Sequence, residues 1–184
     1  MNPALKEVPI FSFEDYLEWD LHQEEKHEYV NGRVFAMAGV TDDHDLVVVN
    51  MLAALHTHLH GKGCRVYTGD MKLKVRFKHA EIGYFPDVMV VCDPEDIGKL
   101  FKTRPKVLVE VMSDYRKDHV EKFMAYQHLE SLEDYLVINQ DPEDPKAWIY
   151  RRAANWDQAI VEREGTIELP SIGFSVRLEE LYRA

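Results

Sequence analysis

Two carboxylates stand in apolar sequence, where an unpaired charge is costly. Glu110 lies in the middle of the apolar run 106–112, and Asp87 opens a second apolar run, 84–92, directly after Pro86. Both runs read as strands buried on both faces. Burial of an unpaired carboxylate is strongly unfavourable, so the fold must supply a cation, a metal or a proton. Two carboxylates on adjacent apolar strands therefore indicate a metal site.

A lysine completes this group. Lys122 lies roughly two turns into a helix that we expect after the Glu110 strand, so it can return over the end of that strand. In such a trio the carboxylates hold Mg²⁺, the metal polarises a phosphate and acidifies a water, and the ammonium orients that water or stabilises transition-state charge. Asp87, Glu110 and Lys122 are thus the parts needed for metal-dependent phosphodiester hydrolysis.

Each residue of the trio also has a structural interpretation. Glu110 alone could form a salt bridge with a neighbouring Lys or Arg, and Asp87 after Pro86 could be a turn residue at a strand start. Lys122 alone would be an ordinary solvated helix lysine. Their occurrence together, in this order, favours the catalytic interpretation.

A strand with one basic face is predicted just upstream. Every second residue from 70 to 78 is charged, and the residues between them are apolar. The charged residues are Asp70, Lys72, Lys74, Arg76 and Lys78. Alternation of this kind places all the charged side chains on one face of a strand. The face could contact DNA phosphates, or it could be the solvated side of an amphipathic strand.

The remaining pattern predicts an α/β protein. We expect a capped helix from Ser12, a hairpin at 27–37 around Asn31-Gly32, and a helix capped by Thr41 that runs from Asp42 to about His60. Its apolar stripe is expected at Leu46, Val49, Leu52, Ala53 and Leu59.

Further elements follow in the same way. A second long helix should begin at Ser113 or Asp114, run to about Leu129, and turn Val120, Phe123, Met124 and Leu129 inward. Strands are predicted at 65–68, 71–78, 85–92, 106–112, 134–139, 147–151, 159–163 and 166–169, and a short helix at 178–183. These elements make a sheet of mixed strand direction.

Composition sets the broad class. The chain has 184 residues, of which 46% are hydrophobic, and no linker-like stretch divides it, so we expect one domain spanning 1–184. No apolar run can span a bilayer and no signal peptide is evident, which predicts a soluble cytoplasmic protein without membrane contact. Cys64 and Cys92 lack CxxC spacing, so buried free thiols are favoured. A net charge of −11 argues against global electrostatic coating of nucleic acid.

The chain resembles a known group of proteins at several short motifs. Pro86-Asp87 followed by Glu110 on the next strand is similar to the PD-(D/E)xK nuclease superfamily, and more closely the chain resembles the Uma-two family of restriction endonuclease-like proteins, abundant in cyanobacteria. The resembling stretches are 28–32, His44, 69–75, 84–90, 109–113, 121–123 with Tyr126, and 131–135. They extend over most of the chain.

The resemblance implies a restriction-endonuclease-like mixed β-sheet flanked by helices, with an N-terminal helix and hairpin. It also implies metal binding by Asp87 and Glu110, with Glu28 as an additional acid. The superfamily pattern places a lysine two residues after the second acid, where this chain has Met112. In the resembling family the lysine has moved to the following helix, so the role falls to Lys122. His44 and Asp70 match family positions without a role derivable from the residues.

The sequence as a whole predicts a Mg²⁺-dependent DNA endonuclease in which Mn²⁺ could replace Mg²⁺. Asp87, Glu110, Lys122 and Glu28 are the candidate catalytic residues, and the candidate substrate contacts are His44, Asp70, Lys72, Lys74 and Arg76. A homodimer is expected, because cutting both strands of a duplex needs two sites related by a two-fold axis. The alternatives are a catalytically degenerate binding or assembly module and a hydrolase of small phosphodiesters.

Overall fold

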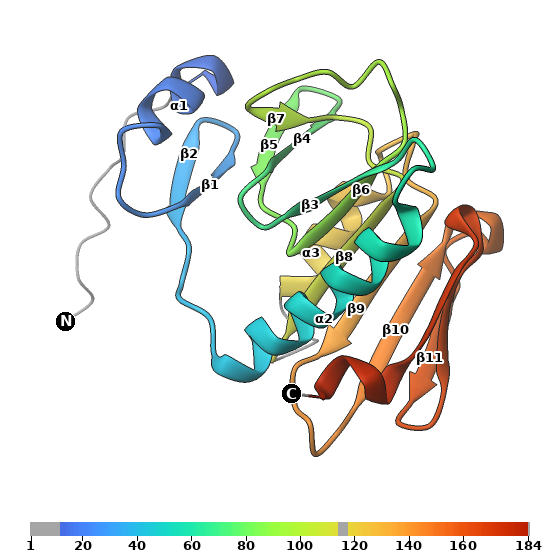
Figure 1. Cartoon of the computed structure of the whole chain (residues 1–184). Helices are drawn as coiled ribbons and strands as arrows, with labels where there is room; N and C mark the ends of the chain where they lie inside the picture. Colours follow the sequence, from blue (N-terminus) through green and yellow to red (C-terminus); the bar gives the residue numbers. More distant parts are fainter. Residues whose placement is uncertain (1–11, 114–117, 184) are drawn as a thin grey trace.

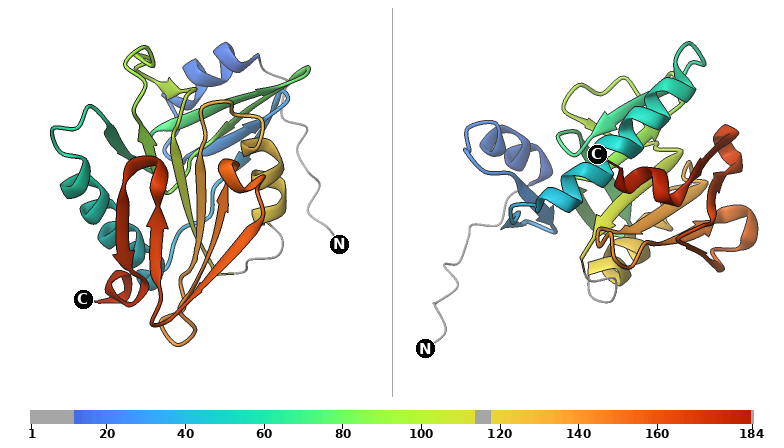
Figure 2. Two further views of the ribbon diagram at one scale, coloured as in Figure 1. Left: turned by 90° about the vertical axis from the view of Figure 1, so that its right-hand side faces the viewer. Right: turned by 60° about the horizontal axis from the view of Figure 1, so that its bottom comes forward.

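A sheet with helices on both sides forms the centre of the molecule (Figures 1 and 2). The computed structural model describes residues 12–113 and 118–183, and its helices are α1 (Phe13–Asp20), α2 (Asp42–Leu59) and α3 (Asp118–Tyr126). The strands are β1 (His27–Val30), β2 (Arg33–Ala36), β3 (Arg65–Thr68), β4 (Lys72–Phe77), β5 (Ala80–Tyr84), β6 (Val88–Val91), β7 (Phe101–Lys102), β8 (Val107–Met112), β9 (Asp134–Asn139), β10 (Lys146–Arg151), β11 (Gln158–Glu162), β12 (Thr166–Leu169) and β13 (Phe174–Arg177). Short 3₁₀ turns follow at η1 (Arg152–Ala154), η2 (Pro170–Ile172) and η3 (Leu178–Tyr182).

The central sheet has the strand order β11-β10-β9-β8-β6-β3. Strands β8 and β9 are parallel, and the other neighbours are antiparallel, so the predicted mixed sheet is confirmed. Parallel neighbours need a crossover connection, and α3 supplies it. Because of this connection, α3 packs back over the sheet beside the strand it has just left.

A second sheet, β2-β1-β5-β4-β7, carries α1. The predicted capping box is present, with the Ser12 hydroxyl accepting from the backbone N–H of Asp15 at 3.1 Å. The predicted hairpin is present too, since Asn31 and Gly32 have φ of 49° and 85°, which a tight two-residue hairpin turn requires. The N-terminal helix and hairpin expected from the sequence are therefore confirmed.

Helix α2 covers one face of the central sheet and α3 the other, as the left view of Figure 2 shows. The buried stripe of α2 is Val47, Met51, Leu55 and Leu59. Of the predicted stripe, Leu59 is buried, Leu52 is half-buried against the core and Leu46 is half-buried. Val49 and Ala53 were expected inside but are exposed, Val49 to 51%. The sequence is apolar from 46 to 49, so the helical period alone could not select the face that packs on the sheet.

Helix α3 also differs from its prediction. It is described from Asp118 to Tyr126, so it ends before Leu129, and the proposed cap at Asp114 lies outside the described residues. Val120 and Met124 were expected inside but are 51% and 62% exposed. The inward positions predicted at Phe123 and Leu129 are confirmed, since Phe123 is half-buried and Leu129 is buried in the same apolar cluster as Ala125 and Tyr126.

The two cysteines form a disulfide, which corrects the expectation of free thiols. Cys64 and Cys92 flank the β3–β6 pair, one residue beyond Arg65 and Val91, and are 28 residues apart in the chain. The spacing of the two cysteines carries no signal for this bond, because they become neighbours only through antiparallel pairing of the strands.

Strands β5, β7 and β13 were not predicted. Strand β5 contains Gly83, where an added Cβ would lie 3.0 Å from the ring of Phe13, so a side chain there would collide with α1. The mixed composition of β5 lacks the apolar run of a typical strand.

Among the described helices, none is long and apolar enough to cross a membrane.

Candidate active site

The register of the central sheet brings the two predicted carboxylates level. Val88 on β6 pairs with Val109 on β8, so the next position along each strand places Asp87 opposite Glu110. Asp87 accepts a hydrogen bond from the backbone N–H of Val111 at 2.7 Å. The two acids thus lie at the same end of neighbouring strands, as the sequence predicted.

Glu110 is buried against α3, and both its oxygens have partners. The side chain is 3% exposed. Its Oε2 accepts from the Lys122 ammonium at 3.2 Å, and its Oε1 accepts from the Tyr126 hydroxyl at 2.7 Å. Since Lys122 and Tyr126 are four residues apart on α3, they share one helical face, and this face meets the carboxylate.

Lys122 joins the central sheet to the first hairpin. Besides Glu110, its ammonium contacts Oε1 of Glu28 on β1 at 3.3 Å. The side chain of Lys122 is 16% exposed and that of Glu28 is 23% exposed. The structure therefore brings together Asp87, Glu110, Lys122 and Glu28, which come from four separate elements of the sequence.

His44 reaches the same site from the first turn of α2. Thr41 caps this helix by accepting from the backbone N–H of His44 at 3.3 Å, which fixes the position of the histidine. The His44 Nε2 lies 3.3 Å from Oδ2 of Asp87. Its Nδ1 is buried and has no hydrogen-bond partner among the described residues. The hydrogen bond to Asp87 raises the pKa of His44.

The electrostatics of Glu110 reflect its burial. The pKa of this carboxyl is raised from 4.5 to about 7, mainly because burial removes solvent; the charge of Asp87 also raises the pKa, whereas Lys122 and Tyr126 lower it. The carboxylates around Lys122, in contrast, raise the pKa of the ammonium. The lysine is thus held as a cation at neutral pH, while Glu110 lies close to its titration point.

The donor set suits a hard divalent cation. Carboxylate oxygens are the protein ligands that Mg²⁺ prefers, and Mg²⁺ is commonly held by one or two carboxylates with waters and phosphates completing its shell. A cation between Asp87 and Glu110 would relieve the repulsion that raises the Glu110 pKa. Within residues 12–113 and 118–183, no group of three or more His, Cys, Asp or Glu side chains could hold a metal on its own.

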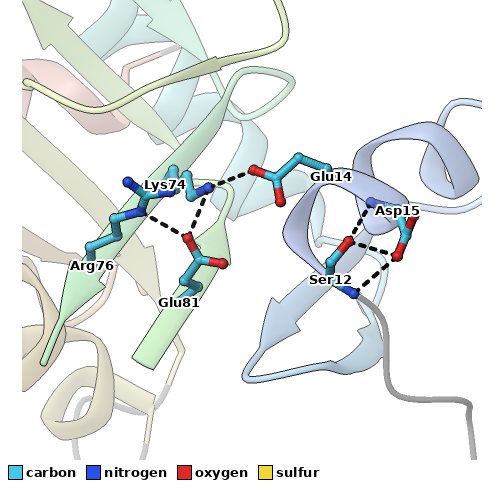
Figure 3. Close-up of polar contacts among 6 residues, drawn as sticks. All are labelled: Ser12, Glu14, Asp15, Lys74, Arg76 and Glu81. Atoms are coloured by element: carbon cyan, nitrogen blue, oxygen red, sulfur yellow. Dashed lines mark hydrogen bonds and ion pairs between the residues drawn. The ribbon is translucent and has the colours of Figure 1, made fainter. Parts of the chain in front are cut away.

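The basic face predicted on β4 is covered by α1 and by neighbouring acids (Figure 3). Lys72 contacts Asp20 at 2.8 Å. Lys74, only 5% exposed, contacts Glu14 at 3.3 Å and Glu81 at 3.0 Å. Neither prediction for this face, a phosphate-binding stripe or a solvated side, describes Lys72 and Lys74. The reason is tertiary, because acids from α1 and β5 lie over the strand.

The outer members of this face differ from its centre. Arg76 is exposed but donates to Glu81 at 2.8 Å. Lys78 lies in the turn after β4 with a φ of 54°, so it has left the strand face. Asp70 is exposed before β4 and forms an ion pair with Lys26. Lys72, Lys74 and Arg76 are thus paired with Asp20, Glu14 and Glu81, and within the described residues they form no ion pair with Asp87, Glu110 or Glu28.

Tyr126 is the contact that the residue types did not predict. Tyr126 is part of the family resemblance, but the resemblance does not indicate its hydrogen bond to Glu110. The usable signal was its spacing of four residues from Lys122 on the same helix. A phenol at that position can satisfy a carboxylate oxygen that the lysine leaves open.

Two cavities open on either side of this group. One, of about 620 Å³, is lined by Asp87, His44 and Asp70, and by apolar residues of α2. The other, of about 390 Å³, is lined by Glu28, Lys122 and Tyr84. Met37 and Ala38, in the segment that runs from β2 to α2 (Figure 1), line both. Asp87 and Lys122 therefore open to solvent through different cavities.

A family model described as "Uma2: Putative restriction endonuclease" matches residues 13–179. The chain belongs to the Uma2 family. The family resemblance and the restriction-endonuclease-like fold expected from the sequence are confirmed.

Relatives of this Uma2 chain extend over nearly its whole length. It is 33% identical over 178 residues to the "Uncharacterized protein slr1290" of Synechocystis sp., with 95% of this chain and 93% of that protein covered. A second Synechocystis protein, "Uncharacterized protein sll1609", is 26% identical and matches 71% of this chain and 76% of its own length.

A solved structure shares the Uma2 chain's fold. A crystal structure from Anabaena variabilis, described as "a putative nuclease belonging to DUF820", superposes with a TM-score of 0.72. The alignment covers 95% of this chain and 97% of that one, at 13% sequence identity. At this sequence identity the similarity establishes the fold, and the activity must be argued from the residues of the site.

Proposed function

We propose that this Uma2 protein is a Mg²⁺-dependent endonuclease that hydrolyses phosphodiester bonds of DNA. The observation that carries the proposal is the Lys122 ammonium held 3.2 Å from Glu110 and 3.3 Å from Glu28, with Asp87 level with Glu110. A fixed cation beside paired carboxylates suits phosphoryl chemistry. The nuclease description of the family adds a nucleic acid as the substrate class.

Asp87 and Glu110 would hold the metal, and Glu28 is a further acid close to it. Bound Mg²⁺ supplies charge neutralisation at the phosphate and a more acidic water. Tyr126 orients Glu110 by donating to Oε1, and Val111 orients Asp87 through its backbone N–H. Lys122 positions the attacking water or stabilises negative charge on the phosphate, since its ammonium is held by carboxylates from two elements.

A second candidate is hydrolysis of a small phosphodiester. Internal pairing of Lys72, Lys74 and Arg76 supports it, because this strand cannot then neutralise a run of DNA phosphates. The net charge of −11 also opposes the binding of a long polyanion such as DNA. A degenerate module without catalysis is the third possibility, in which Lys122 is simply the structural partner of Glu110.

A cleavage assay separates these candidates. The full chain is incubated with single-stranded DNA, duplex DNA and bis(p-nitrophenyl) phosphate in Mg²⁺, Mn²⁺, Ca²⁺ or EDTA. We expect DNA cleavage in Mg²⁺ and Mn²⁺, and none in EDTA. Glu110→Gln and Asp87→Asn should abolish it, whereas the surface variant Lys146→Met should match the parent. Activity on the small diester alone would favour the second candidate, and inactivity on every substrate would favour the module.

Lys122→Met tests the proposed role of the lysine. Turnover should fall by roughly 100-fold or more while Mn²⁺ still binds, because the ammonium acts on the reacting groups. Mn²⁺ binding is measured by electron paramagnetic resonance. Unchanged turnover would remove Lys122 from the mechanism.

The endonuclease proposal includes a homodimer. Two-fold-related sites would cut the two strands of a duplex in one encounter. Light scattering during gel filtration gives the mass directly, and a monomer that still introduces double-strand breaks would remove the dimer from the proposal.

A further inference from the structure

The cavity beside Asp87 has walls of two chemical kinds. Its volume is about 620 Å³, within the range of ligand pockets. One side is apolar and formed mainly by α2 and the segment before it: Met37, Val40, Val48, Val49 and Leu52. Val40 is 62% exposed and Val49 is 51% exposed. Exposed apolar side chains beside a catalytic carboxylate indicate a surface that a ligand covers.

The charge of the cavity restricts what can enter. Among the described residues, its lining includes the four carboxylates Glu25, Asp45, Asp70 and Asp87, against Lys26 as the only lysine or arginine. Lys26 is already paired with Asp70. In the metal-free protein, a phosphate group inside this cavity would meet net repulsion, because the four carboxylates outnumber the basic groups of the lining. The occupant is therefore uncharged, with apolar faces and N–H donors that the carboxylates can accept.

Continuity with the catalytic group identifies the occupant. Asp87 and His44 belong both to the cavity wall and to the carboxylate site, where Nε2 of His44 lies 3.3 Å from Asp87. A group bound there is next to the phosphate being hydrolysed, so it must be attached to that phosphate. A nucleobase is such a group, because it is neutral, has two apolar faces and carries N–H donors at its edge.

We propose that the cavity formed by α2, the segment 37–40 and the start of β6 binds one nucleobase, unstacked from the strand being cut, beside the scissile phosphate. This inference deepens the proposed endonuclease function and rests on it for the position of the phosphate. It predicts that single-stranded or frayed DNA is the preferred substrate, since extrusion from a duplex costs pairing and stacking energy.

Uncharged probes test the cavity without any catalysis. The metal-free full chain, labelled at Val and Leu methyl groups, is titrated with deoxyadenosine, deoxycytidine, 2-deoxyribose and inorganic phosphate. The nucleosides should shift the Val40, Val49 and Leu52 resonances with millimolar affinity, while Val161 and Leu169 stay unchanged. 2-Deoxyribose and phosphate should shift none of them. No nucleoside shift up to the solubility limit, or an equal shift with phosphate, would overturn the proposal.

Val49→Glu provides the variant test. A further carboxylate in the apolar wall should remove nucleoside binding, whereas Ile160→Glu, at a 57% exposed apolar position on β11, should leave it unchanged. On single-stranded DNA, Val49→Glu should raise KM about tenfold with kcat nearly constant, because base stacking contributes to binding on this scale. The parent should show a similar loss when the base beside the cleaved bond is replaced by an abasic residue.

The two arms of the experiment separate failure of the cavity from failure of the nuclease. Nucleoside binding without cleavage of any DNA would leave the base site in place and refute the endonuclease. Cleavage that ignores both the abasic residue and Val49→Glu, with no methyl shifts, would refute the base site alone.

Discussion

At the scale of single residues, Glu110 illustrates how one buried acid organises a site. Its two oxygens take partners from α3, and the backbone beside it holds Asp87. A buried carboxylate without such partners would be strongly destabilising. The stability of the metal-free protein and the proposed chemistry therefore involve the same contacts, and substitutions can separate the two effects.

Tyr126→Phe should destabilise the metal-free protein by about 1–3 kcal/mol, because Oε1 of Glu110 is left buried without a donor. Tyr84→Phe is the matched control, since this neighbouring hydroxyl forms no hydrogen bond within the described residues. Urea denaturation gives both free energies of unfolding. Equal effects of the two substitutions would show that the Tyr126 hydroxyl does not stabilise Glu110.

The raised pKa of Glu110 predicts a pH dependence of stability. Its folded-state pKa of about 7 exceeds the ordinary 4.5, so between these values the folded state binds more protons than the unfolded state. Stability from this group must then fall as pH rises through that window. Relative to Glu110→Gln, the metal-free parent should lose about 1–3 kcal/mol between roughly pH 5 and pH 8. Parallel pH profiles of the two proteins would contradict the assignment.

At the scale of secondary-structure elements, charged residues attach α1 to the second sheet. Lys74 contacts acids of α1 and β5 (Figure 3). Its ammonium also lies 3.9 Å from the ring centroid of Phe13. The hydrogen bond from Lys74, together with Arg76, lowers the pKa of Glu81. A lysine that pattern alone assigned to a surface stripe thus belongs to the packing of a helix.

Lys74→Met should cost about 1–3 kcal/mol, because an ion pair and a cation–π contact are lost together. Arg76→Met, at a 70% exposed side chain, should change stability by only about 0.5 kcal/mol. Folding lowers the pKa of Glu81, so the ionised carboxylate stabilises the folded state at pH values above the ordinary pKa of 4.5. This stabilisation is lost as the pH falls and the carboxylate becomes protonated. The difference in stability between the parent and Lys74→Met should therefore become smaller in acid, which thermal denaturation at several pH values measures. A difference that does not change with pH would show that the ion pair of Lys74 with Glu81 is not its cause.

The disulfide joins edge strand β3 to β6 at the end of β6 remote from Asp87. Closure of a 28-residue loop restricts the unfolded chain, and reduction should lower stability by about 3–4 kcal/mol in the chain-entropy model. Denaturation with and without dithiothreitol measures the difference, and Cys64→Ser with Cys92→Ser is the control that should not respond to the reductant. If the reductant leaves the parent unaffected as well, the bond does not contribute.

At the scale of the whole molecule, the acidic net charge controls how DNA can approach. A chain with a net charge of −11 repels a polyanion. The lysines that could have formed a basic strand face are instead paired internally. If the proposed endonuclease function holds, association with DNA should depend on divalent cations at the carboxylate site.

DNA binding should accordingly require a divalent cation. In Ca²⁺, fluorescence anisotropy should detect binding of single-stranded DNA that EDTA or Asp87→Asn removes. The double variant Lys74→Met, Arg76→Met should leave the salt slope nearly unchanged, whereas two lost phosphate contacts would make it shallower by about 1.4–1.8. A shallower slope of that size would restore β4 as a DNA-binding strand.

The sequence by itself determined the local features and identified the candidate acids of the site. The capping box at Ser12, the hairpin at Asn31-Gly32 and the strands 65–68 and 134–139 follow from local backbone preferences, which neighbouring residues encode. Glu110 and Asp87 were identifiable because charge in an apolar strand is rare and costly. Their order and spacing also carried the family resemblance.

Only the tertiary structure decided which surfaces meet. The inward faces of α2 and α3, the pairing of Cys64 with Cys92 and the burial of Lys74 under α1 all depend on contacts between segments distant in the chain. Periodicity specifies a repeat along one element, but it does not specify the partner that covers each face. For the same reason, the hydrogen bond from Tyr126 to Glu110 and the cavity beside Asp87 emerge only when α2, α3 and the sheet are assembled.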